Sequence, residues 1–152
     1  MNNYALIKDF LMFKNHLFLL ILIPIYGWSQ TPVDLKSLTQ VDDIYCQTHS
    51  TNPYTGTVYS LHSDGNLLLE GCLENGKWGN NTVYYKNGQK QFENSYKNGI
   101  RHGVQLWWYE NGQLKSSQSY KNNILDGVSR SWWPDGRTMG EYLYVNGVIQ
   151  SR

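Results

Sequence analysis

The residues that could carry out acid–base or metal chemistry are few and scattered. Beyond residue 30 the chain has three histidines, His49, His62 and His102, and no two of them lie within four positions of each other. Zinc sites combine closely spaced histidine and cysteine ligands, and no cysteine or aspartate spacing here predicts one. We therefore expect no metal site.

The carboxylates and hydroxyls do not form a recognisable catalytic set. Two pairs of glutamates are close only in sequence: Glu70 with Glu74, and Glu93 with Glu110. A glycosidase needs two carboxylates about 5–10 Å apart in one cleft. Three serines have neither a partnered base nor a strained turn: Ser116, Ser117 and Ser119. The segment 71–79 lacks the Gly-Lys-Ser/Thr ending of a phosphate loop. The sequence predicts neither an enzyme nor a cofactor.

Residue types that are common at binding surfaces are more frequent than possible catalytic groups. Aromatic residues make up 14% of the chain and charged residues only 16%. The exposed surface must therefore be rich in Tyr, Trp, Asn, Gln and Ser, which is typical of contact surfaces. Beyond residue 29 the chain has 11 basic and 11 acidic side chains. It lacks the basic stripe of a nucleic-acid binder and the polybasic clusters that anionic lipids attract.

A fixed period organises the chain from residue 56 onward. Four glycines recur at steps of 23, 24 and 24 residues: Gly56, Gly79, Gly103 and Gly127. Nine places after each stands a second glycine, preceded by Asp or Asn, and an asparagine stands at the nineteenth place. Such a period predicts a repeat array, in which each unit buries its apolar face against its neighbours.

One repeat has the pattern of a β-hairpin. Residues 104–110 and 113–120 are extended candidates on either side of Asn111-Gly112. Asn-Gly favours a type I′ turn, because both central residues need positive φ. The Tyr-x-Asn-Gly stretch at 96–99 then returns the chain to the next hairpin. We predict an all-β, elongated, single-layer antiparallel meander over residues 43–152, with about four 23–24-residue repeats after a leading half-repeat at 43–47. No helix is expected after residue 30.

A two-residue turn would fix the register of the third hairpin. It places Tyr109 opposite Leu114, Trp107 opposite Ser116 and Trp108 opposite Lys115. The repeat then stacks two columns on opposite faces: Leu61, Tyr84, Trp108 and Trp132 on one, and His62, Tyr85, Tyr109 and Trp133 on the other. The second column would share the core side with Leu73, Tyr96, Tyr120, Tyr144, Leu67, Phe92 and Leu114. A bulge in the loop would move return-strand residues to the other face.

The first 29 residues are typical of a signal peptide. An apolar run, LFLLILIPIYGW, follows Lys14 and His16, and Gly27-Trp28-Ser29 is a small-x-small cleavage pattern. Met12 would give a more compact signal than Met1, so both starts stay open. The run is shorter than the ~20 residues of a membrane-spanning helix. We expect export to the periplasm, cell surface or medium, with residues 30–42 as a flexible lead-in.

Export would permit a disulfide between Cys46 and Cys72, the two cysteines of the chain. A meander places them two strands apart, about 9.5 Å, which exceeds the ~7 Å Cα separation of an unstrained bridge. The meander argues against the bond, although a bent first hairpin would allow it.

The segment 96–112, YKNGIRHGVQLWWYENG, and the segment 121–136, KNNILDGVSRSWWPDG, resemble the bacterial variant of the MORN (membrane occupation and recognition nexus) repeat. The resemblance extends over about residues 54–147, with Asn123 replacing the usual glycine. It implies curved sheets of hairpins that contact proteins or lipids, and bacterial members are often described as antitoxin-like.

Most aromatic side chains are expected to hold the sheet together. Those left for partner binding are Trp107, Trp108 and Trp132, together with Arg130. The sequence favours an exported, non-enzymatic scaffold whose aromatic face binds a macromolecule, foremost a protein. A glycan-binding surface protein and an antitoxin or immunity-like component are the alternatives. The partner, the free face and the oligomeric state stay open.

Overall fold

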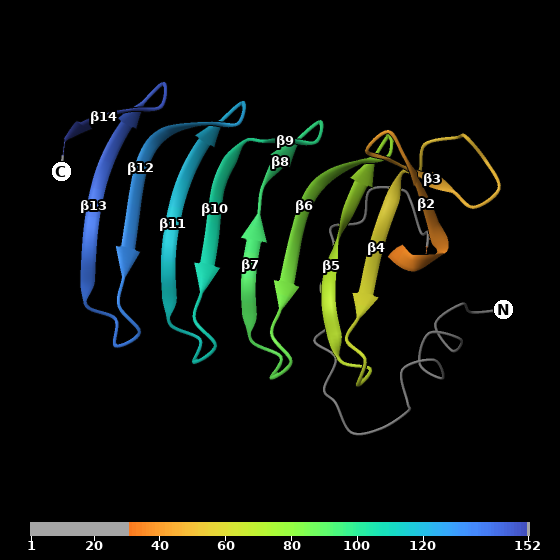
Figure 1. The fold of residues 1–152 in the computed structure, drawn as a ribbon, viewed down its shortest axis with the longest axis horizontal. Helices are drawn as coiled ribbons and strands as arrows, with labels where there is room; N and C mark the ends of the chain where they lie inside the picture. The colour runs from red at the N-terminus through yellow and green to blue at the C-terminus, as the bar shows by residue number, and fades with distance from the viewer. Residues whose placement is uncertain (1–30, 152) are drawn as a thin grey trace, which may run out of the picture.

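A computed structural model describes residues 31–151 as an open β-sheet of ten strands, laid side by side in one layer (Figure 1). Every neighbouring pair is antiparallel except the first, in which β1 runs parallel to β4. The order across the sheet is β1 (Val33–Asp34), β4 (Gly56–Leu61), β5 (Leu67–Glu74), β6 (Lys77–Tyr84), β7 (Lys90–Asn94), β10 (Gly103–Trp108), β11 (Leu114–Lys121), β12 (Ile124–Trp132), β13 (Thr138–Val145) and β14 (Val148–Ser151). The predicted all-β meander is confirmed, and the predicted signal peptide lies outside the described residues.

The lead-in is more regular than its sequence predicts. After β1 come the 3-10 turn η1 (Leu35–Ser37) and strand β2 (Leu38–Val41), which pairs with β3 (Ile44–Gln47) in a separate two-stranded sheet. Residues 33–41 of the predicted flexible lead-in thus form regular elements, and its flexibility stays a prediction. The prediction that residues 43–47 form a leading half-repeat of the main sheet is wrong, because β1 and not β3 lies beside β4.

The buried core lies at this N-terminal end of the sheet. Tyr54, Val58 and Leu73 are 5%, 1% and 2% exposed. Five partly buried residues pack against them: Val33, Leu35, Leu38, Tyr45 and Trp78. The leading segment thus covers the first hairpin, as a capping unit does in a repeat array.

The loop edge of the sheet does not have the predicted type I′ turns. The N–H of Tyr109 donates to the carbonyl of Gln113 over 2.8 Å, so Tyr109 does not lie opposite Leu114. The N–H of Gly112 donates back to Tyr109 over 2.9 Å, and of Asn111 and Gly112 only the glycine has positive φ (85°). This is a three-residue loop closed by a left-handed glycine. The same loop recurs at Asp64-Gly65, Asn87-Gly88 and Asp135-Gly136.

Type I′ turns close the hairpins of the opposite edge instead. Lys121 pairs directly with Ile124, and the two residues between them, Asn122 and Asn123, have φ of 53° and 67°. Asn75-Gly76, Asn98-Gly99 and Asn146-Gly147 form the equivalent turns. The hairpin β8 (Tyr96–Lys97) and β9 (Ile100–Arg101) is separate from the main sheet.

A bulge in each return strand restores the register that the longer loop would shift. Trp107 lies opposite Ser116, as predicted, but Trp108 pairs with Leu114 and Lys115 is the extra residue. Leu114 therefore shares the face of Trp108, and Leu67, which pairs with Leu61, shares that of Leu61. Placing these two leucines on the core side was wrong, because the bulge moves them across the sheet.

The chain bends where each strand leaves the type I′ edge, as the curved ends of β10 and β12 show (Figure 1). At the bend in β12 the register with β11 shifts between Gln118 and Tyr120. Gly127, with φ of 112°, lies so close to the neighbouring strand that a Cβ would be 2.9 Å from the Cβ of Ser119. Only glycine fits this backbone and this spacing.

Candidate binding surface

The sheet has two faces of different chemistry. Leu106 pairs with Ser117, which pairs with Arg130, so these residues share one face. Alternation along the strands adds Trp108 and Trp132 to it, and we name it the tryptophan face. The other, named the amide face, carries a row of polar side chains: Asn81, Asn94, Gln105, Gln118 and Ser129.

The amide face is a packed structural surface. Gln105 is 1% exposed, and its Nε2 donates to the carbonyl of Ser95 over 2.7 Å. Asn94 Nδ2 donates to Asn81 Oδ1 over 2.9 Å. The core residues Val58 and Leu73 belong to this face, which confirms the predicted core side.

Trp107 lies on the amide face and apart from the other predicted binding residues. Its ring meets that of Phe92 edge-on, with centroids 6.4 Å apart and planes at 89°. Phe92 is also its cross-strand neighbour. This geometry is that of a stabilising aromatic pair, so the packing of Trp107 is accounted for within the sheet.

Trp108, Trp132 and Arg130 come together on the tryptophan face. Lys90 places its ammonium 5.6 Å from the centroid of the Trp108 ring and forms an ion pair with Glu93 over 2.6 Å. Arg130 forms an ion pair with Glu141, and both side chains are about half exposed (50% and 52%). The Glu141 carboxylate raises the pKa of Arg130. One of these ion pairs thus lies along β7 and the other across β12 and β13.

Aliphatic side chains that the sequence argument missed lie between these groups. Val104 is 45% exposed and Leu143 39%, and Val128 pairs with Leu143. Val104 and Leu106 of β10 and the Val128–Leu143 pair lie on either side of β11, which carries Ser117 and Ser119 on this face. We call these four residues, beside Trp108 and Trp132, the apolar patch. The first two repeats have Thr57 and Asn80 at the position of the two valines. Comparing the residue after each repeat glycine would have found this difference.

The second aromatic column joins consecutive repeats. The hydroxyl of Tyr85 donates to the carbonyl of Trp108 over 2.9 Å, and that of Tyr109 donates to the carbonyl of Trp132 over 3.0 Å. The loop asparagines add a parallel series, in which Asn111 Nδ2 donates to the carbonyl of Pro134 over 3.0 Å. These side chains have the structural role predicted for most of the aromatics.

Main-chain hydrogen bonds join the repeats along the type I′ edge. The N–H of Asn123 donates to the carbonyl of Arg101 over 2.9 Å, and Gly147 bonds Leu125 in the same way over 2.8 Å. The Asn123 side chain adds a contact that glycine could not make, because its Oδ1 accepts from the N–H of Arg101 over 2.9 Å.

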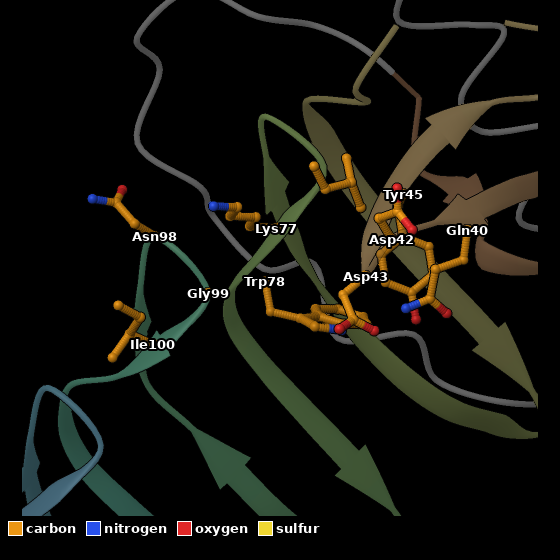
Figure 2. A pocket seen from close by; sticks show the side chains of 10 residues that line it. Gln40, Asp42, Asp43, Tyr45, Lys77, Trp78, Asn98, Gly99 and Ile100 are labelled. Carbon is orange, nitrogen blue, oxygen red and sulfur yellow. The ribbon is translucent and has the colours of Figure 1, made fainter. Parts of the chain in front are cut away.

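A groove opens at the same edge, near the N-terminal end of the sheet (Figure 2). Its lining comes from three places: the turn between β2 and β3, the start of β6, and the β8–β9 hairpin. The lining residues include Asp42, Asp43, Tyr45, Trp78 and Ile100.

The described part of the chain holds no group of three His, Cys, Asp or Glu residues placed to bind a metal ion. Cys46, in the separate β2–β3 sheet, and Cys72, in β5, are free thiols. No helix between residues 31 and 151 has the length and apolar character needed to cross a membrane.

A comparison with known protein families finds a match for this chain. Residues 79–98 and 101–122 match the MORN repeat variant. Each matched segment covers most of one long hairpin, β6–β7 or β10–β11, and ends in a type I′ turn. The hairpins β4–β5 and β12–β13 have the same loop and turn architecture on either side. No curated protein matches the chain.

Proposed function

We propose that this protein is an exported, non-enzymatic MORN-repeat scaffold that binds a protein partner through its tryptophan face. The observation that carries the proposal is the apolar patch beside Trp108 and Trp132. Its residues Val104 and Leu143 are 45% and 39% exposed in a sheet that is a single layer at this point (Figure 1). Exposed apolar side chains gathered beside tryptophans and charged residues on one face are typical of interaction sites.

The composition of the face favours a protein over other partners. Tryptophan and arginine are enriched among the residues that dominate protein–protein binding energy, where truncation costs about 2 kcal/mol or more. Arg130 and Lys90 are already paired with Glu141 and Glu93, so neither cation of these two pairs is free for a nucleic acid. MORN repeats serve as scaffolds for protein or membrane interactions, which agrees with this assignment.

Export rests on the sequence of residues 1–29 and has its own test. Fractionation of cells that produce the full chain should place it outside the cytoplasm. Recovery of the full-length, uncleaved chain in the cytosol would remove the export part of the proposal and favour the antitoxin-like alternative.

Site-specific photo-cross-linking tests the binding face. A photoreactive residue at position 143, within the apolar patch, should capture a discrete protein in the native envelope. The same residue at position 94, on the amide face, is the control and should not. Trp108→Ala combined with Trp132→Ala should abolish capture at position 143 while the far-UV spectrum stays unchanged.

Two outcomes would count against binding of a protein through the tryptophan face. Equal capture from positions 143 and 94 would contradict a specific face. A glycan-array signal lost in the Trp108→Ala/Trp132→Ala variant, without protein capture, would instead support the glycan-binding alternative.

A further inference from the structure

The groove at the type I′ edge has a volume of about 580 Å³ and lies away from the tryptophan face. One wall is the tip of the β2–β3 hairpin, with Asp42 and Asp43. The other is the β8–β9 hairpin, with Ile100, and Trp78 lies between them (Figure 2). It therefore combines carboxylate, aromatic and aliphatic surface in one opening.

Packing at the base holds the acidic wall in place. The N–H of Tyr45 donates to the carbonyl of Gly76 over 2.9 Å, and a Cβ on Gly76 would lie 2.3 Å from Cγ2 of Ile44. The Tyr45 and Trp78 rings meet edge-on with centroids 5.6 Å apart. The β2–β3 hairpin is thus seated on the sheet, and the groove is formed without a partner.

The charges of the groove are unbalanced and unpaired. The side chains of Asp42 and Asp43 make no hydrogen bond or ion pair within the described part of the chain. Lys77 is the one basic residue in the lining. Figure 2 shows its side chain extending toward Asn98, away from both aspartates. The net negative wall complements a cation brought from outside.

Elsewhere in the described part of the chain, three partly buried aromatic rings are each contacted by one of the chain's own cations. Lys90 lies over Trp108, Arg101 over Tyr120 and Lys115 over Tyr109, each 5.4–5.6 Å from the ring centroid. No such contact is formed by Trp78 or Tyr45 with any described residue. The groove thus has aromatic rings and two carboxylates, but none of the chain's own cations lies over those rings.

We propose that the groove binds a basic side chain, lysine or arginine, of a protein partner. The ammonium or guanidinium group contacts the Asp42 and Asp43 carboxylates, and the methylene stem lies along Trp78 and Ile100. Aromatic and carboxylate surfaces are the two environments that stabilise a partly desolvated cation. This site is independent of the tryptophan face and would act as a second point of attachment.

Nuclear magnetic resonance titration with a short blocked peptide tests the proposal directly. Acetyl-Gly-Lys-Gly-amide should shift the backbone signals of residues 42–45 and the indole signal of Trp78. The matching norleucine peptide, which keeps the stem and lacks the charge, should bind about tenfold more weakly. Added salt should weaken the lysine peptide, because the carboxylates are exposed.

The variant Asp42→Asn/Asp43→Asn removes the charge without disturbing the turn, since asparagine tolerates positive φ well. It should lower the affinity about tenfold or more. Asp64→Asn makes the same change in an exposed loop outside the groove and should leave the affinity unchanged. Lys77→Met removes the competing cation and should strengthen binding.

Three results would overturn the proposal. They are shifts spread over the surface, equal effects of the two peptides, and unchanged binding by Asp42→Asn/Asp43→Asn. Trp108→Ala should not affect this titration, so failure here and failure of the tryptophan-face proposal can be told apart.

Discussion

The hydroxyl of Tyr109 donates a hydrogen bond to the main-chain carbonyl of Trp132, 23 residues further along, over 3.0 Å. One repeat earlier, Tyr85 makes the same contact with Trp108 over 2.9 Å. A side chain at a fixed place in each repeat thus holds the backbone of the next. The stability of the array is then a sum of hairpin and nearest-neighbour terms, and single-residue changes can separate them.

Removing one such contact should weaken the array by a small, measurable amount. Tyr109→Phe should lower the free energy of unfolding by about 0.5–1.5 kcal/mol, because the Trp132 carbonyl loses its side-chain donor. Urea denaturation measures the change. Tyr144→Phe is the control and should have almost no effect, because the Tyr144 hydroxyl has no partner in the described part of the chain. Equal effects would contradict the proposed role of Tyr109.

Two glycines with positive φ should respond differently to alanine. Gly65→Ala should cost only the strain of a positive φ in a residue with a side chain, since no atom lies within 4 Å of the added Cβ. Gly127→Ala meets the same strain and a contact of 2.9 Å with the Cβ of Ser119. We expect Gly127→Ala to cost at least about 1 kcal/mol more than Gly65→Ala. Thermal denaturation of both variants checks this, and similar losses would rule out close packing at the bend.

Trp107 and Trp108 should separate stability from binding, although they are neighbours in sequence. Trp107→Ala removes the edge-on contact with Phe92 and should lower the free energy of unfolding by about 1–3 kcal/mol. Its folded fraction should still capture the partner. Trp108→Ala should reduce capture. Loss of capture in both variants, after correction for the folded fraction, would mean that the amide face also contributes.

The free energy of unfolding should decrease at alkaline pH, and Tyr84 should cause part of the decrease. Burial raises the pKa of Tyr84 above its ordinary value of about 10, and the hydrogen bond to Glu70 adds to the effect. The unfolded tyrosine therefore ionises at lower pH than the folded one. Its contribution to stability is complete below about pH 10 and is lost as the pH rises further.

The measurement is urea denaturation at about pH 9 and about pH 11. Tyr84→Phe should lose less stability between these values than the parent protein does. Part of the loss should persist, because burial also raises the pKa of Tyr54. An identical loss in the variant and the parent would contradict this role of Tyr84.

Short-range patterns predicted the number and length of the hairpins but not the chemistry of their turns. Asn98-Gly99 and Asn111-Gly112 are the same dipeptide, yet only the first has positive φ at both residues. The difference depends on how many flanking residues the two strands leave unpaired. That is decided by pairing across the whole sheet, which a local signal cannot report.

The candidate site was predictable to the same extent. Alternation along β12 places Arg130 and Trp132 on one face, and the repeat register places Trp108 there too, as the structure confirms. The adjacent Trp107 had to point the other way, but its contact with Phe92 follows from a pairing between two different repeats. The groove depends on three hairpins that are far apart in the sequence, and no pattern along the chain predicts it.

The sequence by itself determined the all-β meander, its period and the face on which most aromatic side chains lie. Glycine and asparagine at fixed places, with strand-forming residues between them, leave the backbone few alternatives. The tertiary structure decided the compensating bulges, the capping of β4 by β1 and the formation of the groove. These depend on contacts between distant segments, whose free energy is shared among many residues and is not encoded in any one of them.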